Sequence, residues 1–180
     1  MLIINYYGSL AIALSTLLLA ANAQASRLCA GIENTAITAT TPSADFTDNG
    51  DGTVTHHKTG LIWQRCSLGQ SWDGTDCIGN ATEFTWADAL AAGAQNSLAG
   101  FSDWRLPNKN ELASIVEFRC IAPAINNQIF PATPLDWYWS SSPNATLSYS
   151  AAWIVSLGYG DVNYTSKDYQ HRVRLVRAGQ

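Results

Sequence analysis

The sequence has few charged residues and no excess of positive charge. Asp, Glu, Lys and Arg together make up 13% of the 180 residues, and the formal net charge is −4. Nucleic-acid-binding domains usually carry a broad basic excess, so this composition argues against a nucleic-acid partner. The hydrophobic share of 47% is instead typical of a globular domain with a real core.

A hydrophobic run long enough to cross a membrane is also missing. The apolar stretch at residues 10–21 is shorter than the roughly 20 residues that a transmembrane helix needs. It is followed by Ala23-Gln24-Ala25, an A-x-A-type cleavage site. Although no Lys or Arg precedes Arg27, this pattern predicts a signal peptide over residues 1–25 and no membrane span in the mature chain. We therefore expect an extracytoplasmic protein that resides in the periplasm, on the cell surface or in the medium.

Motifs of the common enzyme classes are absent as well. The sequence contains no Gly-rich phosphate loop, no G-x-S-x-G and no H-E-x-x-H. Ser140, Ser141 and Ser142 have no histidine nearby in the sequence. His56 and His57 are adjacent, so in a strand they would point to opposite faces. Exposed histidines are the first interpretation, a three-histidine metal site with His171 is the alternative, and we expect no enzyme.

The four cysteines all follow the predicted cleavage site. An even number of cysteines in an exported chain favours disulfides, and no C-x2-C pair supports a zinc site. Four cysteines allow three connectivities. Because residues 68–74 have the composition of a self-contained loop, we predict the pairs Cys66–Cys77 and Cys29–Cys120.

Short strands and two helices are predicted along the chain, which makes an α+β fold. Strand patterns fall at residues 46–48, 53–55, 61–63, 138–141, 152–156, 162–165 and 172–176. Thr85 with Asp88 predicts a helix over 86–95, and Asn108 with Glu111 predicts a second helix that runs to about residue 118. Residues 26–45 show little periodicity and are interpreted as an N-terminal arm, and residues 46–180 as one domain.

A basic patch is predicted near the C-terminus. Arg172 and Arg174 would share one face of the final predicted strand, flanked by Lys167 and Arg177. Guanidinium groups pair well with sulfate, carboxylate and phosphate, so this patch is a candidate anion-binding surface. The alternative is a solvated edge strand whose charges block aggregation.

Aromatic residues in predicted loops and hairpins are further candidates for ligand contact. Trp72, Tyr159, Tyr164 and Tyr169 fall in such segments, where their rings could stack on sugars. We combine Tyr159 and Tyr164 with the basic residues above as the candidate ligand-binding set.

An acidic turn suggests a metal site. Asp48, Asn49 and Asp51 offer oxygen ligands of the kind that calcium prefers. The acidic residue that closes an EF-hand loop is missing, and Asn-Gly and Asp-Gly pairs are also the best residues for hairpin turns. A simple turn is therefore the first interpretation, and calcium is the one cofactor that the sequence suggests.

Several motifs resemble the Lcl C-terminal domain family, which is named for a bacterial collagen-like adhesin. They are D-N-G-D-G-T-V-T at 48–55, T-G-L-I-W-Q-R at 59–65, T-W-A-D-A-L at 85–90, A-G-F-S-D-W-R-L-P-N at 99–108, Y-W-S-S-S at 138–142 and V-R-L-V-R at 173–177. The resemblance runs from about residue 45 to residue 177. Leu175 stands where we expect many relatives to carry Cys.

The resemblance implies a C-type-lectin-like fold, akin also to formylglycine-generating enzymes, with two helices on short irregular antiparallel sheets. It also implies exported or surface proteins, some of which bind sulfated glycosaminoglycans, and it brings no active site. The leading hypothesis is thus an exported, adhesin-like binding module for a surface or matrix glycan, anionic or sulfated, or for a protein. A structural or assembly component of a bacterial envelope or surface appendage is the alternative, and an unrecognised enzyme is a third hypothesis. An oligomeric state is compatible with this sequence.

Overall fold

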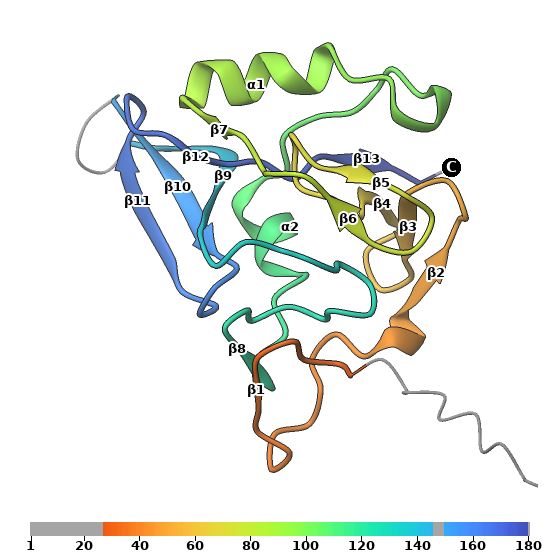
Figure 1. Ribbon diagram of the computed structural model, residues 1–180. Helices are drawn as coiled ribbons and strands as arrows, with labels where there is room; N and C mark the ends of the chain where they lie inside the picture. The colour runs from red at the N-terminus through yellow and green to blue at the C-terminus, as the bar shows by residue number, and fades with distance from the viewer. Residues whose placement is uncertain (1–26, 146–149, 180) are drawn as a thin grey trace, which may run out of the picture.

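The computed structural model describes residues 27–145 and 150–179, which form two main β-sheets with two helices (Figure 1). The predicted signal peptide at residues 1–25 lies outside the described residues. Within the described ranges, no helix has the length and apolar character needed to cross a bilayer. The predicted α+β class is confirmed.

The first main sheet has four strands in the order β13-β4-β3-β2, all antiparallel. Its members are β2 (Phe46–Asp48), β3 (Thr53–His56), β4 (Leu61–Gln64) and β13 (Val176–Ala178). The first three form the meander that the strand and turn patterns predict. The turn between β3 and β4 contains Gly60 at φ 67°, a conformation that glycine adopts without steric cost.

The second main sheet has five strands in the order β11-β10-β9-β12-β7. Its members are β7 (Glu83–Phe84), β9 (Trp137–Asn144), β10 (Ala151–Ser156), β11 (Val162–Ser166) and β12 (His171–Arg172). β10 and β11 form the predicted hairpin, in which Trp153 lies opposite Tyr164. β12 runs parallel to β9, and the other pairs are antiparallel.

The predicted final strand at 172–176 is divided between the two sheets. Arg172 ends β12 in the five-stranded sheet, and Val176 begins β13 in the four-stranded sheet. In the segment between the two strands, the carbonyl oxygen of Val173 accepts a hydrogen bond from the Leu68 N–H at 2.9 Å. The carbonyl oxygen of Leu175 accepts one from the Gln64 N–H at 3.1 Å. This segment therefore bridges the sheets and is buried.

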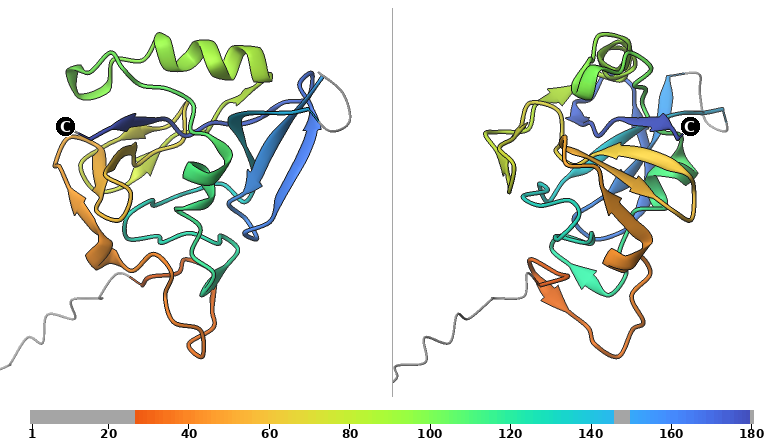
Figure 2. Two further views of the ribbon diagram at one scale, coloured as in Figure 1. Left: turned by 180° about the vertical axis from the view of Figure 1, so that it is seen from behind. Right: turned by 90° about the vertical axis from the view of Figure 1, so that its right-hand side faces the viewer.

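Helix α1 (Trp86–Ala94) begins and ends almost as predicted. The N–H of Asp88 donates to the Thr85 side chain, as an N-cap requires. α1 lies along one side of the molecule above β12 and β13, as Figures 1 and 2 show.

Helix α2 (Lys109–Ala113) is shorter than predicted. The capping box between Asn108 and Glu111 is present, but the helix stops at Ala113 rather than near residue 118. The next amides donate to carbonyl oxygens three residues back, and Ile115 and Val116 turn into the core. Packing of these two side chains thus ends the helix early.

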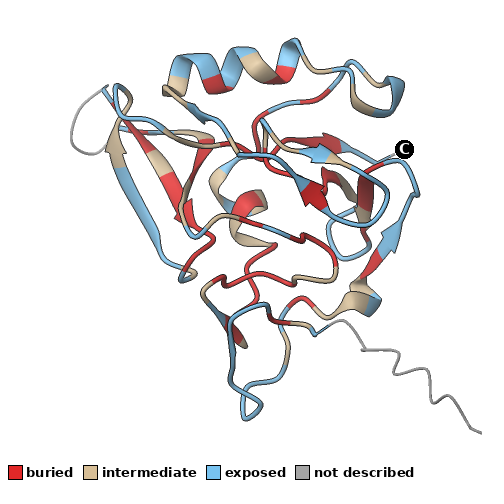
Figure 3. Ribbon diagram, in the orientation of Figure 1, coloured by how far each residue is buried: buried red, intermediate tan, exposed pale blue. Residues whose placement is uncertain are grey.

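The core surrounds α2 and lies between the two sheets. One cluster contains Trp63, Leu112, Phe130 and Tyr138, and a second, under α1, contains Trp139. In Figure 3 the buried colour follows β4, β10 and the crossing segment before β13, while α1 is mostly exposed.

Two disulfides join loops to this core with the predicted pairing. Cys66–Cys77 closes a short loop and Cys29–Cys120 a long one. The short loop contains the hairpin β5 (Ser71–Trp72) and β6 (Cys77–Ile78).

The predicted N-terminal arm is held against the body. Its strand β1 (Ile32–Glu33) pairs with β8 (Cys120–Ile121). The buried carboxylate of Glu117 accepts hydrogen bonds from the backbone N–H groups of Thr40 and Thr41, at 2.9 and 2.7 Å. The arm is thus a packed part of the structure.

Candidate functional site

A pocket of about 360 Å³ lies where four segments meet. Trp72 comes from the β5–β6 hairpin, Gly52 from the turn before β3, Gln64 from the end of β4, and Asn96 and Leu98 from the segment after α1. This volume falls within the roughly 300–1,000 Å³ of small-molecule sites. We define these residues, with Asp51, as the Trp72 pocket.

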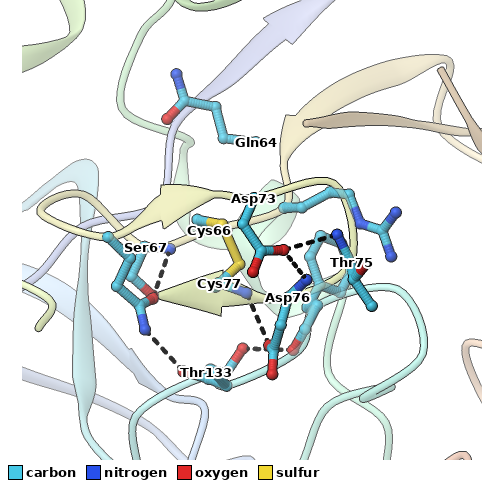
Figure 4. The surroundings of a disulfide bond; sticks show 12 residues. Gln64, Cys66, Ser67, Asp73, Thr75, Asp76, Cys77 and Thr133 are labelled. Carbon is cyan, nitrogen blue, oxygen red and sulfur yellow. Dashed lines mark hydrogen bonds between the residues drawn. A yellow bond between two sulfur atoms is a disulfide. The ribbon is translucent and has the colours of Figure 1, made fainter. Parts of the chain in front are cut away.

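The hairpin that carries Trp72 is rigid for local reasons. The Cys66–Cys77 disulfide closes its base, as Figure 4 shows. At its tip the Asp73 carboxylate accepts from the N–H groups of Thr75 and Asp76, both at 2.8 Å. These bonds lower the pKa of Asp73, with the contribution of Asp76 the largest. The position of Trp72 is therefore fixed at both ends of the hairpin.

Arg65 supports Trp72 from within the protein. Its guanidinium lies 4.0 Å from the centre of the indole ring, a cation–π contact. The same group pairs with Asp48 and donates to the carbonyl oxygens of Gln128 and Ile129, at 2.8 and 3.0 Å. The guanidinium of Arg65 is thus bound to groups of the protein itself, and it orients the indole ring of Trp72.

A pair of side-chain amides also lines the pocket. Gln64 is only 4% exposed, and its Nε2 donates to Asn96 Oδ1 at 2.7 Å. The backbone N–H of Leu98 donates to the same oxygen at 3.1 Å. Figure 4 shows the Gln64 side chain directed away from the Cys66–Cys77 disulfide. Two planar polar groups thereby face a cavity that an indole also lines.

Neither Gln64 nor Asn96 is a candidate site residue from the sequence alone. They lie 32 residues apart. Gln64 falls in the T-G-L-I-W-Q-R motif at 59–65 and Asn96 in none of the motifs, and the fold alone brings the two together. The signals of this site in the sequence are Trp72, an aromatic residue in a predicted loop, and Asp51 of the acidic turn.

The predicted basic patch is wrong at its centre, Arg174. This residue is 0% exposed. Its guanidinium donates to the carbonyl oxygens of Gln64 and Arg65 and to the hydroxyls of Ser67 and Thr133. Burial lowers the pKa of Arg174 to about 10. The reason for the correction is the crossing of residues 173–175 between sheets, which leaves them no solvent face.

The flanking arginines are paired rather than free. Arg172 contacts Asp136 at 3.1 Å and Glu83 at 3.0 Å. Arg177 is buried and donates to Asp103 at 2.7 Å, and this hydrogen bond lowers the pKa of the Asp103 carboxyl. The three arginines therefore do not form one exposed anion-binding surface.

The remaining residues of the candidate set lie elsewhere. Tyr159 and Tyr164, on the β10–β11 hairpin, are 64% and 40% exposed. The Lys167 ammonium lies 4.2 Å from the centre of the Trp86 ring. The β10–β11 hairpin and the β5–β6 hairpin lie on opposite sides of the molecule in Figures 1 and 2. These residues are thus separate from the Trp72 pocket.

The acidic turn is held by hydrogen bonds within the protein. Asp48 pairs with Arg65. Asp51 Oδ1 accepts from the N–H and the hydroxyl of Thr53, at 3.0 and 2.6 Å, and Asn49 Nδ2 donates to the same hydroxyl at 2.9 Å. These contacts account for the turn conformation without a cation. Among the described residues, no group of three or more His, Cys, Asp or Glu side chains is arranged to hold a metal ion.

The expectation of exposed histidines is wrong for His56. This ring is buried and stacks on Phe46 at 4.5 Å between centroids, and burial lowers the pKa of His56. His171 is half-buried with its ring edge-on to Trp139, and His57 is exposed. The rings of His56 and His171 thus serve packing.

The chain matches a known protein family at the level of its sequence. A search of curated proteins finds no match to this chain. The model of the Lcl C-terminal domain family matches residues 52–177, which include β3, the β5–β6 hairpin and the segment that bridges the two sheets. The chain therefore belongs to the Lcl C-terminal domain family.

Proposed function

We propose that this protein is an exported, non-enzymatic binding module with an adhesin-like role, and that it takes a surface glycan in the Trp72 pocket. Family membership supports a surface or adhesin-like module. Two disulfides are consistent with an extracytoplasmic protein. The observation that carries the glycan proposal is the pocket itself, where an indole and two side-chain amides line one cavity.

The chemistry of this lining suits sugars. A sugar ring has an apolar face of C–H groups, which packs on aromatic rings, and a rim of hydroxyls, which bind amides. A few fixed polar groups in a pocket with an aromatic wall are typical of small-ligand sites. We include in this proposal the C-type-lectin-like fold that the family resemblance implies.

A protein partner is the second candidate function, because β11 is an edge strand with exposed apolar side chains. Val162 and Tyr164 are 45% and 40% exposed on this strand. An edge strand with such residues can pair with another chain. This observation favours the structural or assembly role in an envelope or surface appendage.

A glycan array that compares the wild type with two variants tests the first proposal. We expect Trp72→Ala to weaken glycan binding about tenfold or more, as for a central aromatic contact. Tyr164→Ala, an exposed aromatic outside the pocket, should leave it unchanged. Repeating the array with a calcium chelator tests the acidic turn. A wild-type protein that retains no glycan, but copurifies with one envelope protein and loses it in Tyr164→Ala, would favour the second function.

A further inference from the structure

The two amides in the Trp72 pocket have a defined orientation. A backbone N–H can only donate a hydrogen bond, so the atom of Asn96 that accepts from Leu98 must be the amide oxygen. Gln64 contacts this same oxygen at 2.7 Å and must therefore do so through its NH2 group. The polarity of both amides follows from the backbone, and the alternative flipped arrangement would place two donors or two acceptors together.

This orientation leaves one acceptor and one donor for a ligand. Within the described residues, neither Gln64 Oε1 nor Asn96 Nδ2 has a hydrogen-bond partner. Gln64 is 4% exposed as a residue, but its Oε1 is not completely enclosed, so water or a ligand in the pocket can satisfy this acceptor. The pocket thus presents a fixed acceptor–donor pair.

Charge determines which glycans fit this pair. Asp51 is the one ionisable side chain among the pocket residues, since Cys66 is in a disulfide. Its Oδ1 is held by Thr53, and its carboxylate would repel a sulfate or uronate group. The guanidinium of Arg65 makes its hydrogen bonds to Asp48, Gln128 and Ile129 instead. An anionic sugar would therefore find repulsion here and no cation to pair with.

We propose that the Trp72 pocket binds an uncharged saccharide through a pair of neighbouring hydroxyls. One hydroxyl donates to Gln64 Oε1, the next accepts from Asn96 Nδ2, and the C–H face of the sugar packs on Trp72. This inference rests on the proposed glycan-binding function and replaces the sulfated or anionic ligand that the sequence analysis favours.

The test starts from the uncharged glycan that the wild-type protein binds best on an array. Its affinity should be the same in 50 and 500 mM NaCl. Analogues that lack one hydroxyl each should identify two adjacent positions where removal weakens binding by about threefold to tenfold, the effect of one neutral hydrogen bond. Because this comparison uses unaltered protein, it does not depend on the folding of a variant.

Variants test the protein side of the same contact. Gln64→Met keeps the length of the side chain but removes both the acceptor and the NH2 group that donates to Asn96, and it should weaken binding by about threefold to tenfold or more. Gln95→Met, the same change at an exposed position beside the pocket segment, should have no effect. Thermal unfolding shows whether each variant is folded.

Each contrary result has a distinct meaning. Binding only to sulfated or uronic-acid glycans, or binding that fades with salt, would overturn the uncharged-sugar inference while the broader function stands. Full affinity in folded Gln64→Met, or tolerance of every single deoxygenation, would overturn the hydroxyl-pair contact. A blank array for the wild type would overturn the glycan-binding function as well.

Discussion

Trp72 packs directly on the backbone of Gly52. A Cβ placed on Gly52 would lie 3.1 Å from Trp72 Cβ and 3.3 Å from two ring atoms. The turn before β3 and the β5–β6 hairpin are thus in contact at the pocket, and the absence of a side chain at residue 52 sets the position of the indole.

Alanine substitutions at two glycines of this turn separate backbone strain from contact with Trp72. Gly50 and Gly52 have φ values of 80° and 85°, so either alanine should cost about 1–2 kcal/mol of stability. Nothing lies within 4 Å of a Cβ at Gly50. We therefore expect Gly52→Ala, and not Gly50→Ala, to shift the NMR signal of the Trp72 indole N–H and to weaken glycan binding. Equal signals in both variants would contradict the contact.

Arg174→Leu should destabilise the protein strongly. The substitution leaves several buried oxygen acceptors without a donor, and each unsatisfied buried group costs about 1–3 kcal/mol. We expect a total loss of roughly 3 kcal/mol or more in urea unfolding. Arg172→Leu, in partly exposed ion pairs, should lose about 1 kcal/mol or less. A similar loss of unfolding free energy in the two variants would show that the buried hydrogen bonds of Arg174 do not contribute this stability.

Glu117 should make the packing of the N-terminal arm sensitive to acid. Burial opposes ionisation of this carboxyl, but the N–H groups of Thr40, Arg119 and Thr41 outweigh it and lower the pKa below 4.5. Since the folded pKa is the lower one, the stabilisation is present above about pH 4.5 and is lost as the pH falls through the folded pKa. We expect the protection factors of the Thr40 and Thr41 amides against hydrogen exchange to fall in that acidic range.

Glu117→Gln provides the matched variant for this effect. The new NH2 group meets backbone donors, so the variant should lose roughly 2–3 kcal/mol at pH 7 and its arm amides should have low protection factors at every pH. Glu83→Gln, at a partly exposed ion pair, should behave as wild type. Protection factors of the arm amides that do not change with pH in the wild type would refute the role of Glu117.

The two disulfides should differ in their effect on binding. By the loop-entropy model, removing Cys66–Cys77 costs about 3 kcal/mol and removing Cys29–Cys120 about 4–5 kcal/mol. Alanine pairs at these positions, measured by urea unfolding and glycan titration, should both be less stable. Only the first pair should weaken binding at temperatures where it is folded, because that disulfide closes the hairpin of Trp72. Equal loss of affinity in the two variants would count against the pocket.

Local signals in the sequence predicted the elements that depend on local interactions. The caps at Thr85 and Asn108, the β10–β11 hairpin and the cysteine pairing follow from residues close in sequence or from simple loop composition. These features need little information about the rest of the fold, which is why a single sequence was sufficient for them.

The misplaced features depend on burial by distant residues. The alternation of Arg172 and Arg174 indicates a strand with a charged face, but the fold covers Arg174 with Ser67 and Thr133. The pocket could not be predicted for the same reason. Gln64 and Asn96 come together only when β4 and the segment after α1 pack against each other. Periodicity reports which residues share a face and cannot report which faces are solvent-exposed.

The bridging segment at residues 173–175 has a consequence for how the protein opens. Its carbonyls are hydrogen-bonded to Gln64 and Leu68, while its two ends are strands of different sheets. The two sheets cannot separate without breaking the hydrogen bonds of this segment. Unfolding of one sheet alone is therefore disfavoured. We expect β4 and β9 to exchange their amides with a common free energy equal to that of global unfolding, as one cooperative unit.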